Sequence, residues 1–126
     1  MAGDDGVNNN DQGASNTAEA TPSINAILEA LAHDRRRIIL SHLIESDTGV
    51  ATVDELVSHI IDEETRVSDE IPASGDINAQ LHHIHLSKLI YAGVVEYDVR
   101  SQELRYYEAP RLEKLLKFIE SEIQNE

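Results

Sequence analysis

Residues 76–107 read DINAQLHHIHLSKLIYAGVVEYDVRSQELRYY, and the spacing of their apolar side chains changes at Gly93. Before the glycine, leucines recur at helical spacing, and glycine itself suits a left-handed helix C-terminus. After it, apolar and polar residues alternate through 95–99 and again through 104–107, as in two half-buried antiparallel strands. A long helix that leads into a hairpin predicts a winged helix-turn-helix.

Two amphipathic helices and a short strand are expected earlier in the chain. Thr21 suits the N-cap of the first helix, with Pro22 in its first turn, and Asp34 suits the N-cap of the second. Val50 and Ala51 are expected to add a strand beside the hairpin. The residues expected to face the core are Ile24, Ile27, Leu28 and Leu31 in the first helix, and Ile38, Ile39, Leu43 and Ile44 in the second.

A third helix begins at a capping box formed by Thr52 and Glu55. The apolar residues that follow repeat at i, i+3, i+4, i+7 and i+8, which predicts the positioning helix of a helix-turn-helix. The turn after such a helix usually has about three or four residues, but here the acidic insert Asp62–Gly75 intervenes. We expect the insert to extend the helix by about a turn and then to cross as a loop, because Pro72 and Gly75 disfavour a continuous helix.

Two motifs resemble those of the arsenic-repressor-like winged-helix regulators. The pattern HxHLxxLxxAGVV at residues 83–95 resembles their recognition-helix signature, and LAHDRRRIILSHL at residues 31–43 resembles their opening motif. The segments HHIHLSKL and AGVVEYD are also similar to small winged-helix proteins of halophilic archaea. The resemblance covers roughly residues 23–107, and it implies DNA binding and transcription regulation.

The sequence divides into three parts. Residues 1–20, rich in Asn, Asp, Gly and Ala, predict a disordered tail, and residues 21–108 the winged helix-turn-helix domain. Residues 109–126 predict an additional C-terminal helix, so the expected fold class is mainly α with a small antiparallel β-hairpin. This amphipathic helix is expected to pair with its twin in a homodimer, or else to fold back on the first helix. Its apolar stripe is Leu112, Leu115, Leu116, Ile119 and Ile123.

The charge balance bears on which partners are possible. The chain has 24 acidic and 10 basic residues, a formal net charge of −14. In dilute buffer this charge opposes DNA binding, because contacts from lysine and arginine to phosphates supply much of the affinity. At 1 M salt the Debye length is about 3 Å, which screens the repulsion. Acidic, lysine-poor surfaces are associated with halophilic cytoplasm, so we expect a solvated surface rather than an acidic functional site.

Several classes of protein lack support in the sequence. There is no cysteine, which excludes disulfides and thiolate metal sites. No apolar run approaches the roughly 20 residues that a membrane span needs, so a cytoplasmic protein without a membrane partner is expected. No glycine-rich phosphate loop and no nucleophile–base pattern is present, so we expect neither an enzyme nor a cofactor.

The candidate DNA-reading residues lie on one face of the helix at 76–92. At about 100° per residue, a polar row falls opposite the core side. Glutamine can pair with adenine, serine is adaptable, and lysine can bind guanine or phosphate. Two arginines in the hairpin, or wing, are placed to touch backbone phosphates. The candidate contacts to double-stranded DNA are Gln80, His83, Ser87, Lys88, Tyr91, Arg100 and Arg105.

A second apolar row on the same helix supports an alternative function. Ile77, Leu81 and Ile84 border the polar row, so this side is expected to be covered by the insert or by a partner. If a protein partner covers it, the chain is a winged-helix interaction module that does not bind DNA.

Two further clusters have both structural and functional interpretations. Arg35, Arg36 and Arg37 could contact nucleic acid, but arginines in such a run more often pair with acidic neighbours and buttress the fold.

His82 and His85 lie three residues apart and could share a face. A metal site needs three or four convergent ligands, so we expect these histidines to be core and DNA-facing residues, with no bound metal.

Overall fold

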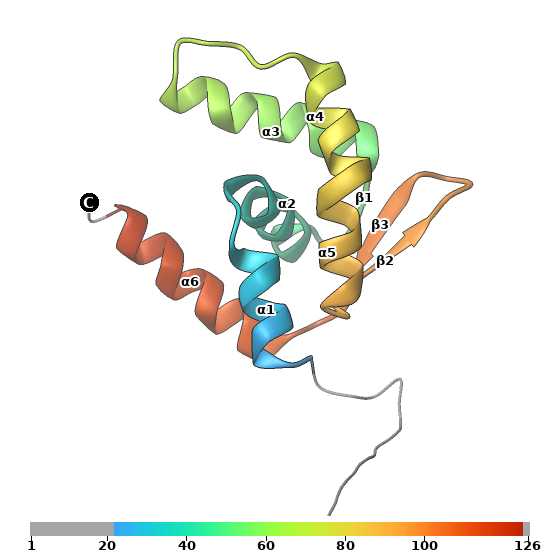
Figure 1. The fold of residues 1–126 in the computed structure, drawn as a ribbon, viewed down its shortest axis with the longest axis vertical. Helices are drawn as coiled ribbons and strands as arrows, with labels where there is room; N and C mark the ends of the chain where they lie inside the picture. The colour runs from blue at the N-terminus through green and yellow to red at the C-terminus, as the bar shows by residue number, and fades with distance from the viewer. Residues whose placement is uncertain (1–21, 125–126) are drawn as a thin grey trace, which may run out of the picture.

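The computed structural model describes residues 22–124, which form a mainly α winged helix-turn-helix with a small antiparallel sheet and an additional C-terminal helix (Figure 1). Three consecutive helical pieces make one continuous helix, called here the long helix (Ser74–Tyr91). The predicted tail at 1–20 lies outside the described residues. The elements are α1 (Ile24–Leu31), α2 (Asp34–Glu45), β1 (Val50–Thr52), α3 (Val53–Val67), α4 (Ser74–Gln80), the π-helical turn η1 (Leu81–His85), α5 (Leu86–Tyr91), β2 (Val95–Asp98), β3 (Glu103–Tyr106) and α6 (Pro110–Gln124).

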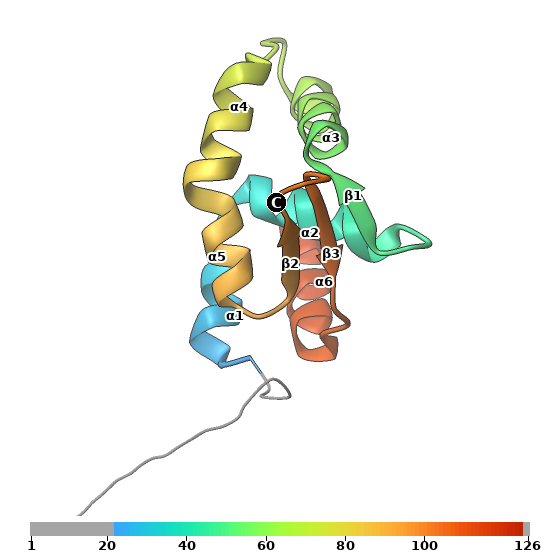
Figure 2. The ribbon, with the colours of Figure 1, turned by 90° about the vertical axis from the view of Figure 1, so that its right-hand side faces the viewer.

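The strands form one antiparallel sheet in the order β1-β3-β2. Leu104 in the central strand lies opposite Ala51 on one side and Tyr97 on the other, and its side chain is fully buried. Figure 2 shows the sheet beside the long helix, with α2 and α6 behind it. The predicted hairpin and the predicted strand at Val50 and Ala51 are both confirmed.

The core lies between the helices and the inner face of the sheet. The stripe expected in α1 is partly wrong, because Ile24 and Leu28 are about half exposed while Ala26 and Ala30 are buried. The small alanine side chains let α1 pack closely on α5. The largest fully buried side chains are Ile27, Leu31, Ile39, Leu40, Leu43, Leu56, Ile60, Ile77, Leu81, Leu89, Leu104 and Leu112.

The first two helices have different N-caps from those expected. Ser23, rather than Thr21, caps α1, and its hydroxyl accepts from a backbone N–H three residues on at 3.0 Å. Thr21 lies outside the described residues. His33, rather than Asp34, caps α2 through Nδ1, which accepts from a backbone N–H at 3.1 Å. Asp34 instead occupies the first turn, where its negative charge is favourable to the helix dipole.

The predicted capping box of α3 is confirmed. The Glu55 N–H donates to Thr52 Oγ1 at 3.1 Å, and the Thr52 N–H donates to Glu55 Oε1 at 3.2 Å. The helix runs on to Val67, so the insert extends it as expected before a loop crosses to the long helix. Gly75, however, lies inside α4 rather than in the loop.

A π-helical turn in the long helix corrects the expected second apolar row. The Leu86 N–H donates to the carbonyl of Leu81, five residues back, so this turn holds an extra residue. In a regular helix the twelve steps from Ile77 to Leu89 would rotate the side-chain direction by about 120° beyond three whole turns. The wider turn removes much of that rotation, and Ile77 and Leu81 are buried in the same core cluster as Leu89. Ile77 and Leu81 are therefore unavailable to a partner, and only Ile84 is exposed, at 44%.

The run of arginines buttresses the fold, as its structural interpretation predicted. Arg36 is buried and donates to the carbonyls of Glu29 and Ala30 at 2.8 and 3.1 Å. Arg37 donates to the carbonyl of Leu31 at 2.6 Å. The last carbonyls of a helix lack partners within it, so these guanidinium groups cap the C-terminus of α1.

The C-terminal helix α6 covers the core of its own chain. Leu112 and Leu116 are 0% and 3% exposed, so they are unavailable for the pairing expected with a second copy. Leu115 and Ile119 are half-buried and pack against the same core. Of the predicted dimerisation stripe, Ile123 is the member left well exposed, at 46%.

Polar contacts fix α6 to two other elements. Tyr106 Oη of β3 donates to Glu113 Oε2 at 2.7 Å. Ser41 Oγ of α2 donates to Glu120 Oε2 at 2.6 Å. The helix therefore folds back on its own domain, against α2 and the sheet.

Candidate nucleic-acid interface

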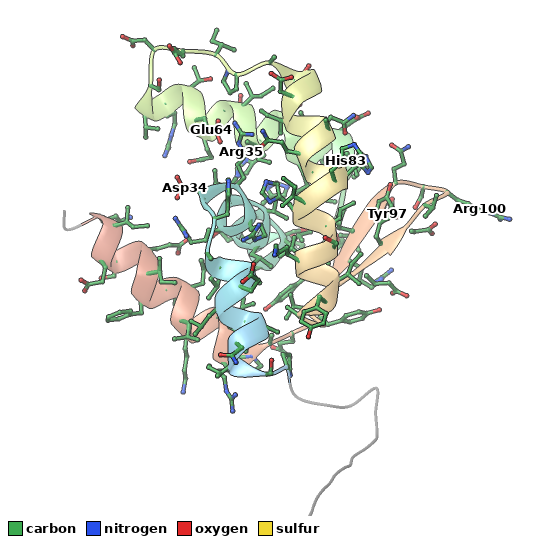
Figure 3. All side chains as sticks on the ribbon, viewed as in Figure 1. Asp34, Arg35, Glu64, His83, Tyr97 and Arg100 are labelled. Atoms are coloured by element: carbon green, nitrogen blue, oxygen red, sulfur yellow. The ribbon has the colours of Figure 1, made fainter. Side chains whose placement is uncertain are left out.

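The long helix presents a polar row to solvent. The side chains of Gln80, His83, Ser87 and Tyr91 are all exposed, and Tyr91 is 81% exposed. Within residues 22–124 neither the insert nor another element covers them. Figure 3 shows His83 on the same side of the molecule as the hairpin. The row is therefore open to solvent in the part of the chain that the structure describes.

Gln80 belongs to a network that joins three helices. Arg35 Nη1 of α2 donates to Gln80 Oε1 at 2.9 Å. The same guanidinium donates to both carboxylate oxygens of Glu64 in α3, from Nε at 2.6 Å and from Nη2 at 2.9 Å. This pairing raises the pKa of Arg35 and lowers the pKa of Glu64. Arg35 therefore stays charged and fixed behind the polar row.

Lys88 is engaged by a carboxylate of the first helix. Its Nζ lies 2.6 Å from Glu29 Oε2, and this contact lowers the pKa of Glu29.

A groove of about 650 Å³ runs between α1 and α5 beside this ion pair. Ser87 Oγ donates to the carbonyl of Ile84 at 3.0 Å, and a hydroxyl keeps acceptor capacity when it donates. The residues that line the groove are Ser23, Asn25, Ala26, Glu29, Ser87, Lys88 and Tyr91.

Arg100 lies at the tip of the wing. Its backbone N–H donates to Asp98 Oδ1 at 3.0 Å, which shapes the turn, while its side chain is exposed. Figure 3 shows the guanidinium pointing away from the molecule. In the part of the chain that the structure describes, no carboxylate lies within 4.0 Å of it. Arg100 is therefore placed as a free cation at the edge of the candidate interface.

Arg105 does not join this surface. It lies directly opposite Glu96 in the sheet, and strand alternation places it on the opposite face from the buried Leu104. This outer face also carries Asp98 and Glu103, which line a hollow together with Arg105. The expected role of Arg105 therefore lacks support, because it shares this acidic outer face with Glu96, Asp98 and Glu103 and faces away from the long helix.

The long helix contacts the wing through a pair that sequence reasoning missed. The rings of His82 and Tyr97 lie 6.1 Å apart between centroids in an edge-to-face arrangement. Such pairs contribute about 0.5–1.5 kcal/mol. Tyr97 lies opposite the buried Leu104, on the inner face of the sheet, but no spacing rule in the sequence connects it to His82. This pair places a side chain of the long helix against the wing.

The histidines of the long helix do not converge on one point. His82 is exposed toward the wing, whereas His85 is 1% exposed and lies in the core. Among residues 22–124 no three histidine or acidic side chains are grouped as a metal site would require. His85 Nδ1 lies 3.1 Å from Arg36 Nη1, which can only donate, so the histidine proton is on Nε2.

These features define the class of protein as a mainly α winged helix-turn-helix with an exposed polar row on its long helix. The chain belongs to the family described as Domain of unknown function (DUF7344), whose model matches residues 28–105. No curated protein matches the chain. No solved structure matches it. Among the helices in residues 22–124, none is both long and apolar enough to span a membrane.

Proposed function

We propose that this protein is a DNA-binding transcriptional regulator, and that the long helix enters the major groove. The observation that supports this most is the open row of Gln80, His83, Ser87 and Tyr91, with the free cation of Arg100 beside it. Polar side chains on one helix face can read base edges, and a wing tip can bind phosphate.

The cellular setting that suits this interface is a salt-rich cytoplasm, as in halophilic archaea. Lys88 and Arg35 are compensated by carboxylates, so Arg100 is the main cation available for phosphate. Each phosphate contact steepens the fall of affinity with salt by about 0.9 logarithmic units per decade. An interface with about one such contact therefore keeps its affinity at high salt, where the repulsion from the net charge of −14 is screened.

A homodimer that presents two long helices would pair through the solvent-facing side of α6. Phe118 is 63% exposed in the middle of that side, with Lys114 and Glu122 four residues before and after it. In an antiparallel pair centred on Phe118, Lys114 of each copy meets Glu122 of the other. Exchange of Phe118 for glutamate should convert a dimer to a monomer in sedimentation at high potassium chloride, and an unaltered dimer would contradict this pairing.

The function is tested by selecting bound genomic fragments at multimolar potassium chloride. The wild-type protein should enrich a limited set of fragments. The double variant His83→Ala, Ser87→Ala should lose that enrichment, because both side chains lie on the open row. The matched control Ser58→Ala, on the exposed side of α3, should enrich the same fragments as wild type. Failure of the wild-type protein to enrich any fragment would overturn the proposal.

A second candidate function is a protein-interaction module. A groove of about 600 Å³ between α2, α3 and α6 combines exposed apolar side chains with carboxylates. Val67 and Ile123 are 83% and 46% exposed there, and the surrounding acids include Glu63, Glu64 and Glu120. This surface favours a basic, amphipathic segment of a partner protein. Purification of a stable protein complex free of DNA, disrupted by Val67→Asp, would support this candidate over the first.

A further inference from the structure

The amide of Gln80 is held in one orientation by its partner. Arg35 Nη1 lies 2.9 Å from Gln80 Oε1. An arginine side chain has donors only, so the amide atom that faces it must be the carbonyl oxygen rather than the nitrogen. The carbonyl oxygen of Gln80 is thus already accepting from a cation, while the amide NH2 keeps both of its donors.

The partner is itself immobilised by the insert. Two parallel hydrogen bonds, at 2.6 and 2.9 Å, join the Arg35 guanidinium to Glu64. Bidentate pairs of this kind fix both position and orientation. Glu64 stands in the part of α3 that the insert adds, beyond Ile61. The extra helical turn therefore supplies the carboxylate that sets Arg35, and Arg35 sets Gln80.

We infer that Gln80 reads DNA as a donor, through its NH2 group, and that the base it selects is guanine. This inference rests on the proposed function. In the major groove guanine offers two adjacent acceptors, N7 and O6, whereas adenine offers one acceptor and one donor. The usual pairing of glutamine with adenine requires the glutamine carbonyl to accept from the base, and here that carbonyl is turned toward Arg35 of α2, which takes one of its two lone pairs. Arg35 and Glu64 are positioning residues for this selection.

The test is selection of bound sequences from a randomised DNA pool at multimolar potassium chloride. Wild-type protein should enrich guanine at one position, and Gln80→Ala should lose the preference at that position alone. Arg35→Ala should keep binding but shift that position toward adenine, by about fivefold or more, the discrimination that one bidentate pair supplies. Glu64→Gln keeps the shape of the site but weakens the hydrogen bonds to Arg35. It should shift the base preference at that position toward adenine as well, but by a smaller factor.

A second ion pair on α3 offers a matched control. Arg66 lies 3.2 Å from Glu63 on the exposed side of the same insert and does not contact Gln80. Arg66→Ala should leave base preference unchanged. Absence of any enrichment by the wild-type protein would overturn the proposed function together with this inference. Adenine selected by wild type, or a base preference unchanged in the folded Arg35 and Glu64 variants, would overturn the inference and leave the proposed function standing.

Discussion

At the scale of single residues, two glycines of the long helix region have opposite conformations. Gly93 follows the helix with φ +77°, whereas Gly75 lies inside α4, and a Cβ at either position would meet no atom within 4 Å. Gly93→Ala should therefore lower the free energy of unfolding by about 1–2 kcal/mol, through backbone strain alone. Gly75→Ala should raise it by about 0.5–1 kcal/mol, because alanine favours the helix. Urea denaturation measures both, and equal effects would contradict this account.

His85 makes stability depend on pH. Burial, together with the positive charges of His33 and Arg36, lowers the pKa of His85 to about 4. Its pKa in the unfolded chain is about 6.5. Between pH 6.5 and pH 4 the unfolded chain binds a proton on His85 and the folded chain does not. The free energy of unfolding is therefore at its full value above about pH 6.5 and decreases as the pH falls toward 4.

We expect the free energy of unfolding to drop by about 2 kcal/mol between pH 7 and pH 5 on account of this histidine. The variant His85→Leu should flatten the slope by that amount. The control Ile84→Leu, on the exposed side of the same turn, keeps His85 in place and should keep the slope. Denaturation curves at several pH values distinguish the two.

At the scale of elements, α6 depends on one tyrosine for its junction with β3. Tyr106 Oη donates to Glu113 and also accepts from the Ala109 N–H at 3.2 Å. Burial and the Glu113 hydrogen bond raise the pKa of Tyr106 well above its usual range. Tyr106→Phe should cost about 1–2 kcal/mol of stability.

The neighbouring tyrosine provides the control for this prediction. Tyr107 Oη donates to Glu96 on the exposed side of the sheet. Tyr107→Phe should leave the denaturation midpoint unchanged, because water replaces an exposed hydrogen bond. Equal losses in the two variants would show that the junction to α6 is not what Tyr106 stabilises.

The elements themselves were largely predictable from local patterns. The capping box, the helix end at Gly93 and the alternation in the strands each involve only a few neighbouring residues. Thr52 and Glu55 are enough to indicate the start of α3, and Gly93 is enough to indicate the end of the long helix. The sequence indicated that Ile77 and Leu81 would be covered, but a projection at constant pitch placed them apart from Leu89, because it cannot anticipate a π-helical turn. The Arg35–Glu64–Gln80 network was also missed, since it joins positions far apart in the chain through tertiary packing alone.

At the scale of the whole molecule, the distribution of charge sets the response to salt. The structure leaves Arg100 as the main free cation near the polar row, and the net charge is −14. Affinity for a selected DNA site should therefore change by less than about tenfold between 0.5 and 2 M potassium chloride, or should rise. A steep fall, as expected for six to ten phosphate contacts, would contradict this interface.

The π-helical turn has a consequence for any comparison with other winged helices. The turn Leu81–His85 holds one residue more than a regular α-helical turn over nearly the same rise. Residues after this turn are therefore shifted by one sequence position relative to the residues that occupy the same places in a regular helix. An ungapped superposition on a regular recognition helix that matches at Asp76 is displaced by one residue at Ser87 and Tyr91. Base contacts transferred from such a helix reach the correct side chains only when the alignment places an insertion inside residues 81–85.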